Sequence, residues 1–317
     1  MMRWPGFAIS TSALLPGWWN WLASQPPPSS EEVMPHRRVR RSILFVPAVR
    51  PDRLPKAIAT GADAVCLDLE DGVSFAQKDE ARSQALALLK DPDAGRAEVV
   101  LRVNEPASEL GERDLTALLE SGVRPDALMI PKISGPETIQ ALDRRLAGRL
   151  DDLPLYAQIE TAAGVAHADA IATASPNVAV MFFGAVDLSA DLGCVIEWDA
   201  LLYARSKVVT AAALAGVDAM DTPFLDVKVP DALAEESRAV RRLGFTGKAA
   251  IHPTQVMPIQ SAFSPDEETV AWARKVVVAY QENRGGVLLV EGKLVERPVI
   301  AAAERVLAIA DAIEAAT

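Results

Sequence analysis

The chain has 317 residues, of which 50% are hydrophobic, and a formal net charge of −11. A chain of this length buries one large core, and its acidity disfavours nucleic acid as the main partner because phosphate binding needs a basic surface. No apolar run reaches the roughly 18 residues of a membrane span, so the sequence predicts none.

Residues 1–40 differ from the rest of the chain in composition. An apolar segment, 7–22, is followed by three prolines and several arginines. Arg3 is the one charge ahead of that segment, and a proline and a glycine interrupt it, which disfavours a signal peptide. We therefore expect residues 1–40 to be a poorly ordered N-terminal extension of a cytoplasmic protein.

Short apolar runs recur along residues 41–260. They cover residues 42–47, 64–71, 98–104, 127–132, 155–160, 180–187, 219–224 and 248–253. Each is rich in Val, Leu, Ile or Phe, as is typical of a strand buried on both faces, and most are separated by a segment long enough for a helix. This order predicts a (β/α)8 TIM barrel over residues 41–260, with its chemistry at the carboxyl ends of the strands.

Helix signals fill the connections between these runs and continue beyond them. We expect connecting helices over residues 76–90, 114–120, 136–146, 161–173, 198–215 and 231–243. After the barrel, the pattern predicts a helix over 264–281, two short strands around Glu291 and Gly292, and a last helix opened by Pro298. Because a closed barrel takes no further strand, residues 261–317 are expected to form a lid or an arm toward a neighbouring subunit.

Polar side chains end most of the predicted strands, and Glu160 and Asp187 are the strongest pair among them. They end the fifth and sixth runs, so their carboxylates are expected to converge at the barrel mouth. Two carboxylates without Cys or His beside them suit a hard cation such as Mg2+, and Gly164 and Gly184 lie nearby. The alternative is that each carboxylate caps a helix or pairs with a lysine.

Three acids, Asp68, Glu70 and Asp71, follow the second run within four positions. Alternation along a strand sends Asp68 and Glu70 to one side and Asp71 to the turn. Crowded acids repel one another unless cations lie among them, so partners are expected from Arg82, Arg102 or Lys132. A structural ion network and a catalytic role both remain open for this cluster.

Arg102 places a permanent charge inside an apolar strand, where leaving it unpaired would be expensive. A bidentate grip on a carboxylate would justify that position, and Asp71 as its only partner is the alternative. Lys132 follows Pro131 and is interpreted as an ion-pair partner of a nearby acid rather than a Schiff-base lysine. His252 is interpreted as a residue held by hydrogen bonds at the barrel floor or rim, and a general base is the alternative.

An ordered set of motifs carries a family resemblance over residues 41 to about 315. The motifs are Phe45-Val46-Pro47, the DLEDGV run from Asp68, Arg102-Val103-Asn104, Pro131-Lys132, Glu160-Thr161-Ala162-x-Gly164, Gly184-x-x-Asp187-Leu188, and Gly244-Phe245-Thr246-Gly247-Lys248 with Ile251-His252-Pro253. Together they resemble the citrate lyase β-subunit-like branch of the HpcH/HpaI aldolases, and within it the acyl-CoA lyases.

The resemblance implies roles for individual residues. Mg2+ would be held by Glu160 and Asp187, with Glu160 also at the acid end of the substrate. The catalytic residues would be Arg102, which holds the substrate carboxylate, together with Asp68 and Glu296. The CoA arm would run along Phe45, Arg53 and Lys56.

Two departures from the family pattern accompany these roles. The family's C-terminal segment crosses a subunit interface and carries an Asp before a proline, where this chain has Glu296 in Val295-Glu296-Arg297-Pro298. The extra methylene displaces that carboxylate by roughly an ångström, and a shift of that size can cost about 10²-fold in rate. Ala48 replaces the family's glycine near the expected CoA path.

The resemblance implies a Mg2+-dependent carbon–carbon lyase that cleaves a hydroxy-carboxy acyl-CoA thioester, of the citramalyl-CoA or malyl-CoA type, to a keto acid and acetyl-CoA. The alternatives are a citrate lyase β subunit acting on citryl-acyl carrier protein, a malyl-CoA thioesterase, or a non-catalytic paralogue that binds CoA esters. The expected partners are the thioester substrate and further copies of the chain, as a homotrimer or a hexamer of trimers, with no nucleic acid and no membrane.

Overall fold

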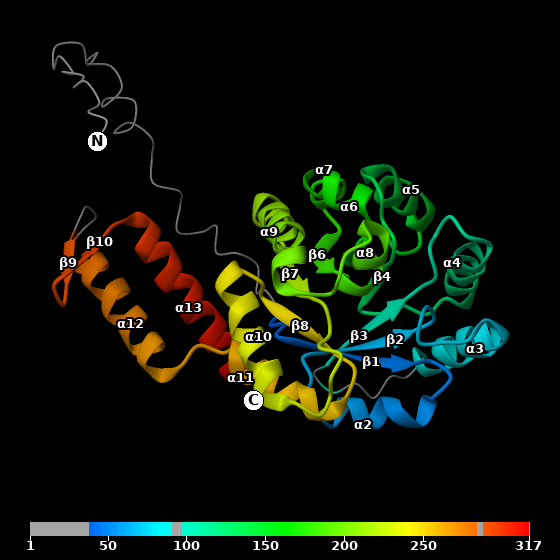
Figure 1. The fold of residues 1–317 in the computed structure, drawn as a ribbon, viewed down its shortest axis with the longest axis horizontal. Coiled ribbons are helices and arrows are strands. Elements are labelled where there is room, and N and C mark those ends of the chain that lie inside the picture. The colour runs from blue at the N-terminus through cyan, green and yellow to red at the C-terminus, as the bar shows by residue number, and fades with distance from the viewer. Residues whose placement is uncertain (1–37, 91–94, 96, 284–287, 317) are drawn as a thin grey trace, which may run out of the picture. The chain divides into compact units, whose positions relative to one another are not determined.

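The computed structural model describes residues 38–90, 95, 97–283 and 288–316. A closed barrel of parallel strands follows the chain order (Figure 1), through β1 (Ser42–Pro47), β2 (Ala64–Asp68), β3 (Glu98–Arg102), β4 (Ala127–Ile130), β5 (Leu155–Ile159), β6 (Val178–Phe183), β7 (Asp218–Asp221) and β8 (Gly247–Ala250). The predicted (β/α)8 TIM barrel is confirmed.

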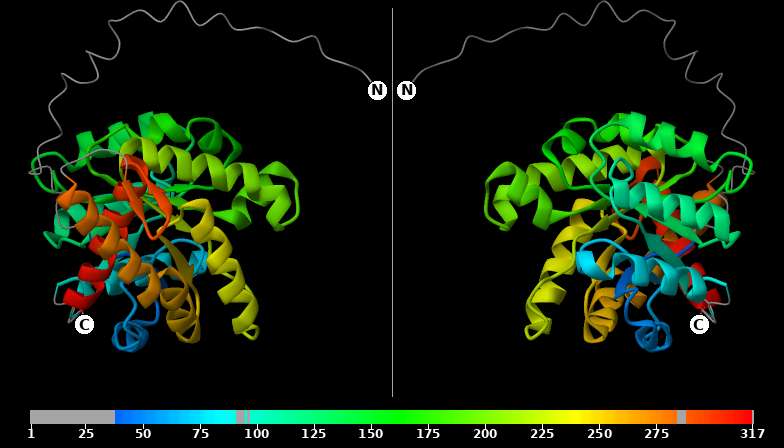
Figure 2. Two further views of the ribbon diagram at one scale, coloured as in Figure 1. Left: turned by 90° about the vertical axis from the view of Figure 1, so that its left-hand side faces the viewer. Right: turned by 90° about the vertical axis from the view of Figure 1, so that its right-hand side faces the viewer.

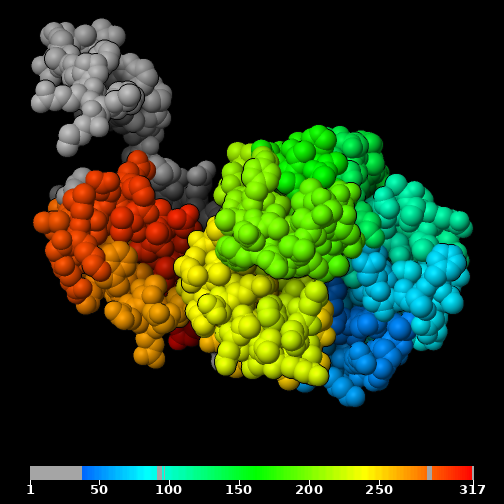
Figure 3. Space-filling view, viewed as in Figure 1, coloured from blue at the N-terminus to red at the C-terminus, as the bar shows by residue number. Residues whose placement is uncertain are grey.

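Helices surround the strands, and on the face shown in Figure 3 the side chains of α9 and α10 cover them. The connecting helices are α2 (Leu54–Ile58), α3 (Lys78–Leu88), α4 (Glu109–Ser121), α5 (Pro136–Leu146), α6 (Ala162–Ala166), α7 (Ala168–Ala172), α8 (Ala185–Leu192), α9 (Trp198–Ala215), α10 (Pro230–Leu243) and α11 (Val256–Phe263). Side-chain caps start several of them; the hydroxyl of Ser108, for example, accepts a hydrogen bond from the backbone N–H of Gly111 at 3.0 Å.

Two expectations about local structure are wrong. The helix predicted over 161–173 is interrupted at His167, which separates α6 from α7. The sixth strand ends at Phe183, and Asp187 lies in the first turn of α8 instead of at a strand end. Gly184 turns the backbone out of the strand, and the spacing of the buried residues Ala185 and Leu188 then follows a helix.

The hydrophobic core has two layers, separated by the barrel wall. The larger layer packs the strands against the helices. The smaller fills the barrel interior with Ile43, Ala64, Cys66, Val100, Ala127, Met129, Tyr156, Val180, Phe182, Met220 and Ala249. Side chains alternate along a strand, so the residue two places beyond an interior side chain also faces inward. By this rule the barrel interior at its carboxyl end also receives the side chains two places beyond Cys66, Val100 and Tyr156. These are Asp68, Arg102 and Gln158.

Arg40 closes the opposite end of the barrel. Its guanidinium donates to Glu98 Oε2 at 2.7 Å and Oε1 at 3.0 Å, and to Asp218 Oδ2 at 3.1 Å. The Tyr156 hydroxyl donates to the same Glu98 carboxylate at 2.8 Å. Glu98 and Asp218 begin β3 and β7, so this network lies at the amino ends of the strands. Of the expected N-terminal extension, residues 1–37 lie outside the described residues.

A C-terminal module follows the barrel and has its own core. It comprises α12 (Glu267–Glu282), the antiparallel strands β9 (Leu288–Val290) and β10 (Lys293–Val295), and α13 (Arg297–Ala316). The left view in Figure 2 shows the hairpin beside the two helices. Its buried residues are Ala273, Val276, Val290, Val295, Ile300 and Ala303. The predicted helix–hairpin–helix extension is confirmed. Within the described part of the chain, no helix has both the length and the apolar character that crossing a membrane requires.

Candidate active site

Asp68 and Arg102 are partners in the strand register, at the carboxyl ends of β2 and β3. The guanidinium holds the carboxylate with two bonds, Nε to Oδ1 and Nη2 to Oδ2, both 2.7 Å long. Nη1 lies 3.0 Å from Glu70 Oε2, and the Phe45 ring lies beneath the guanidinium at 4.9 Å. The expected bidentate grip is therefore occupied by Asp68, and the alternative of Asp71 as sole partner is wrong.

The charge state of this pair follows from its surroundings. Burial alone would raise the pKa of Asp68. The Arg102 guanidinium, together with the backbone N–H groups of Glu70 and Gly72, more than offsets burial and holds that pKa below its usual range. Asp68 is therefore a buried carboxylate that stays ionised and fixes the orientation of Arg102.

The loop after β2 is tied down by a lysine that the sequence analysis did not single out. Lys78 Nζ donates to the carbonyl oxygens of Leu69 and Glu70, both at 2.7 Å, and to Asn104 Oδ1 at 2.8 Å. These bonds fix the backbone that carries the acidic cluster. Arg82, an expected partner of the cluster, pairs with Asp79 and Asp114 instead.

Glu160 directly follows β5 and is held by donors on both oxygens. The backbone N–H of Lys132 donates to Oε1 at 2.9 Å, and Gln158 Nε2 donates to Oε2. A Cβ added at Gly184 would lie 2.5 Å from Glu160 Oε2 and 2.6 Å from Glu160 Cβ, so only glycine leaves room for this side chain. Burial, followed by the negative charges of Glu70 and Asp187, raises the pKa of Glu160 to about 8.

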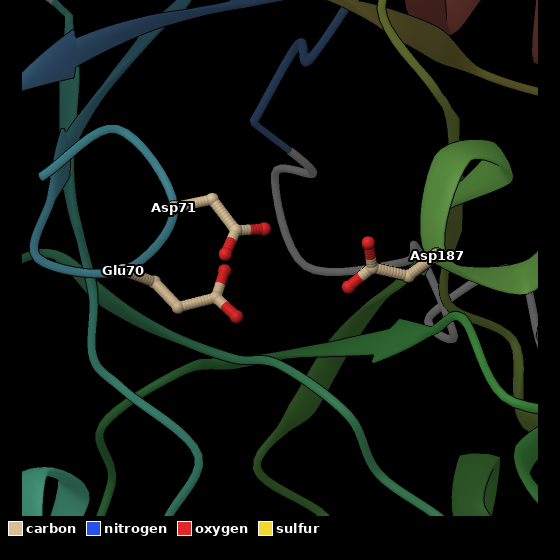
Figure 4. A group of neighbouring side chains, drawn as sticks. All are labelled: Glu70, Asp71 and Asp187. Atoms are coloured by element: carbon tan, nitrogen blue, oxygen red, sulfur yellow. The ribbon is translucent and has the colours of Figure 1, made fainter. Parts of the chain in front are cut away.

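Asp187 reaches the same region from the first turn of α8. The start of that helix is fixed by Thr222, directly after β7, whose Oγ1 accepts the backbone N–H of Ala185 at 3.2 Å. In Figure 4, Glu70 and Asp71 approach from one side and Asp187 from the other, with their carboxylates facing one another. One oxygen from each of the three lies within 4.8 Å of the others.

Lys132 lies among these carboxylates. Its Nζ is 2.8 Å from Glu70 Oε1, 3.5 Å from Asp187 Oδ2 and 4.0 Å from Asp71 Oδ1, which confirms that it is an ion-pair partner of nearby acids. Burial would lower the pKa of Lys132, but the hydrogen bond and charge of Glu70, aided by Asp71 and Asp187, raise it above the usual value. The backbone of Lys132 is left-handed, with φ of 55°.

A pocket of about 370 Å³ gathers these groups at the barrel mouth. Its lining residues are Glu105, Lys132, Ser134, Glu160, Thr161, Asp187, Ala190 and Asp191. Glu160 and Asp187 thus face one cavity, although Asp187 comes from a helix. Their donor atoms are all oxygens, which suits Mg2+. Among the described residues, the lining holds four acids, Glu105, Glu160, Asp187 and Asp191, and one lysine, so the residues fit a bound divalent cation.

The residues expected along the CoA arm occupy two environments. Phe45 faces the barrel interior, where its ring contacts Arg102 and packs edge-on against Phe182 at 6.0 Å. Arg53 and Lys56 are exposed, at the end of η1 (Pro51–Arg53) and in α2, and Lys56 Nζ lies 3.8 Å from Asp52 Oδ2.

Glu296 lies exposed between β10 and α13. Its backbone carbonyl accepts the N–H groups of Val299 at 2.9 Å and Ile300 at 3.2 Å, at the start of α13. Ala48 is fully buried, and its N–H donates to the Asp68 carbonyl at 3.0 Å.

Two other polar strand ends have structural partners. Asp221 accepts from Lys248 Nζ at 2.6 Å and from Arg205 Nε at 3.0 Å, in a buried network. The ring nitrogen of His252 caps the short helix Pro253–Gln255, so His252 is a hydrogen-bonded residue, as predicted.

Sequence reasoning also missed Gln158 and Thr222. A glutamine two places before Glu160 in an apolar strand was a usable signal for the first.

Comparison with known proteins agrees with this geometry. A family model described as HpcH/HpaI aldolase/citrate lyase matches residues 41–253. The chain belongs to this family. A mitochondrial citramalyl-CoA lyase from Rattus norvegicus is 33% identical over 313 residues, covering 92% of this chain and 93% of its own. Citrate lyase subunit beta from Leuconostoc mesenteroides subsp. cremoris is 32% identical, with coverages of 88% and 96%. A (3S)-malyl-CoA thioesterase from Cereibacter sphaeroides is 35% identical, with coverages of 87% and 96%.

Solved structures of family members contain the expected small molecules. The protein CitE from Mycobacterium tuberculosis, in complex with magnesium, acetoacetate and coenzyme A, is 35% identical with a TM-score of 0.73, covering 87% of this chain and 99% of its own. A complex of CitE with magnesium and pyruvate is 31% identical with a TM-score of 0.67, with coverages of 86% and 100%. These findings confirm the predicted family and its lyase class, and they agree with magnesium as the cofactor. The rat relative is named as mitochondrial, so a cytoplasmic location stays a prediction, as do the oligomeric state and the residue roles.

Proposed function

We propose that this member of the HpcH/HpaI aldolase/citrate lyase family is a Mg2+-dependent carbon–carbon lyase. Its substrate would be a hydroxy-carboxy acyl-CoA thioester of the citramalyl-CoA or malyl-CoA type, and its products a keto acid and acetyl-CoA. The observation that carries the proposal is the meeting of Glu160 and Asp187 in one pocket, whose described lining residues include more acids than cations. The citramalyl-CoA lyase relative and the CitE complex with magnesium and coenzyme A support the same chemistry.

The site residues would divide the work by their positions. Glu160 and Asp187 would hold the cation, which when bound acts as a Lewis acid toward the oxygen that becomes the ketone. Gln158 and the Lys132 N–H keep Glu160 oriented. Asp68 and Glu70 fix Arg102, whose N–H groups not bound to these two acids would face the substrate carboxylate.

The remaining roles concern the proton and the coenzyme arm. In cleavage, a base removes the hydroxyl proton, the carbon–carbon bond breaks to leave a keto acid and a thioester enolate, and the enolate takes up a proton to give acetyl-CoA. In the reverse direction a carboxylate removes that proton from the acetyl methyl group. Glu296 is proposed for the latter task, supplied by the C-terminal module of a neighbouring subunit. Arg53 and Lys56 are proposed to contact the CoA phosphates, since they are exposed beyond β1.

A thioester panel tests the proposal. Purified protein would be incubated with citramalyl-CoA, malyl-CoA and citryl-acyl carrier protein, with and without Mg2+, and keto acid and free CoA would be measured. Magnesium-dependent release of pyruvate or glyoxylate with acetyl-CoA is expected, and E160Q should abolish it.

Release of malate with free CoA would instead establish a thioesterase, an alternative favoured by the Cereibacter relative. Cleavage of the carrier-protein substrate alone would identify a citrate lyase β subunit, and no turnover at all would favour the non-catalytic paralogue.

A further inference from the structure

Of the described residues that line the pocket, Lys132 is the one cation. The other nearby positive charge, Arg102, is already engaged by Asp68 and Glu70. Opposite Lys132 lie Glu70, Asp71 and Asp187, and its backbone N–H holds Glu160. The side chain and the main chain of a single residue therefore contact four carboxylates.

The backbone of Lys132 indicates that the side chain matters. A φ of 55° lies in the left-handed region, which strains a residue with a Cβ and which glycine adopts freely. A glycine at 132 would supply the same N–H to Glu160 without that strain. Strain that persists at a functional site indicates that the side chain makes a contribution of its own. Here that contribution is a positive charge 3.5 Å from Asp187 Oδ2.

A divalent cation bound by Asp187 would lie close to the Lys132 ammonium group. Like charges a few ångströms apart repel, and the same Asp187 carboxylate cannot serve both partners fully. The Lys132–Glu70 bond, at 2.8 Å, is shorter than the Lys132–Asp187 contact and does not involve a proposed metal ligand. Metal binding would thus break the weaker of the two contacts and leave the stronger.

We propose that Lys132 is a tethered cation that balances the acidic pocket in the metal-free protein and competes with the divalent ion for Asp187. The inference rests on the proposed function, because it takes Glu160 and Asp187 as the metal ligands. Lys132 stays charged throughout; what changes on metal binding is its partner. The residue thereby sets the concentration of Mg2+ at which the site fills.

The test measures Mg2+ binding to the full-length protein by calorimetry, with no substrate present. The variant K132M removes the charge, and we expect it to bind Mg2+ about 3- to 30-fold more tightly than the wild type, with a larger rise in the unfolding temperature at saturating Mg2+. The variant K132R keeps the charge and should remain within about threefold of the wild type. K207M, which removes another lysine paired with a carboxylate, Asp169, away from the site, should leave Mg2+ affinity unchanged.

Several outcomes would overturn the inference. These are equal or weaker Mg2+ binding by K132M, or equally tightened binding by K132R or K207M. If K132M fails to fold, K132G removes the same charge while suiting the left-handed backbone, and the same tightening is expected of it. E160Q separates the two proposals, because it should abolish Mg2+ binding in both the wild-type and K132M backgrounds. If E160Q leaves binding intact, the metal assignment in the proposed function fails, whatever K132M shows.

Discussion

At the scale of single residues, Glu160 combines deep burial with two hydrogen-bond donors and two acidic neighbours. The donors favour the ionised carboxylate, whereas burial and the charges of Glu70 and Asp187 oppose it, and the opposing effects win. A group in this state holds a proton at neutral pH and gives it up when a cation arrives. The acidity of the pocket thus links proton release to metal binding.

This linkage predicts a pH dependence. Below the Glu160 pKa of about 8, Mg2+ must displace a proton, so we expect apparent affinity to fall roughly tenfold per pH unit between pH 8 and 6.5 and to level off above 8. Calorimetry in buffers of different ionisation enthalpy would count the released protons. An affinity that is flat over this range, with no proton released, would contradict the assignment.

The metal-free protein supplies the control. The folded-state pKa of Glu160 lies above its ordinary value of 4.5, so the native state binds more protons than the unfolded state between these values. The Glu160 contribution to the free energy of unfolding therefore decreases as pH rises from about 4.5 to 8. The variant E160Q should lack both this decrease and the proton release.

At the scale of secondary-structure elements, the junction of β6 and α8 shapes the site. Gly184 follows β6 and has no side chain, which leaves space for Glu160 after β5. Thr222 after β7 anchors the first turn of the helix that carries Asp187. The two proposed metal ligands therefore depend on contacts among three adjacent strands.

The variant G184A tests that dependence. The added methyl group would overlap the Glu160 side chain, so we expect Mg2+ affinity to fall at least about tenfold and kcat/KM about 10²-fold, with the fold retained. The variant G122A is the control: its methyl group meets no atom within 4 Å, but the φ of 69° makes it cost about 1–2 kcal/mol of stability. If G122A impaired Mg2+ binding as strongly as G184A, the effect would reflect general destabilisation and not the displacement of Glu160.

Strand order and most acidic positions could be predicted from the sequence because buried parallel strands are short, apolar and end in polar residues. Alternation correctly placed Asp68 and Glu70 on one side, facing Arg102. The start of α8 could not be predicted, because Val180 to Phe183 and the following Ala-Val are equally apolar and carry no period. Contacts such as that of Thr222 with Ala185 also escaped prediction, since they join residues 37 positions apart.

At the scale of the whole molecule, the C-terminal module forms a core separate from the barrel, and the Glu296 side chain is exposed. If Glu296 acts in a neighbouring subunit, each site combines the barrel of one chain with the module of another. A contact of this head-to-tail kind gives a ring where the rotation between subunits closes, and an open filament where it does not.

Mixed oligomers test this arrangement. E160Q and E296Q should each be nearly inactive alone, but after unfolding and refolding together in equal amounts they should regain about a quarter of the wild-type activity, because that share of sites combines an intact barrel with an intact module. The separately refolded variants, mixed afterwards, provide the control. Activity no greater than their sum would place Glu296 outside a shared site.

The network around Arg40 has a consequence for how this sequence tolerates change. Arg40 precedes β1, and its guanidinium neutralises the Glu98 carboxylate. The Tyr156 hydroxyl in the barrel interior donates to the same carboxylate. Replacing Arg40 with a neutral residue would strand Glu98 without its counter-charge, a defect that typically costs about 3–5 kcal/mol. A substitution at the amino end of the barrel, far from the proposed active site, can therefore still abolish function. It would do so by lowering the amount of folded protein and not by altering the catalytic residues.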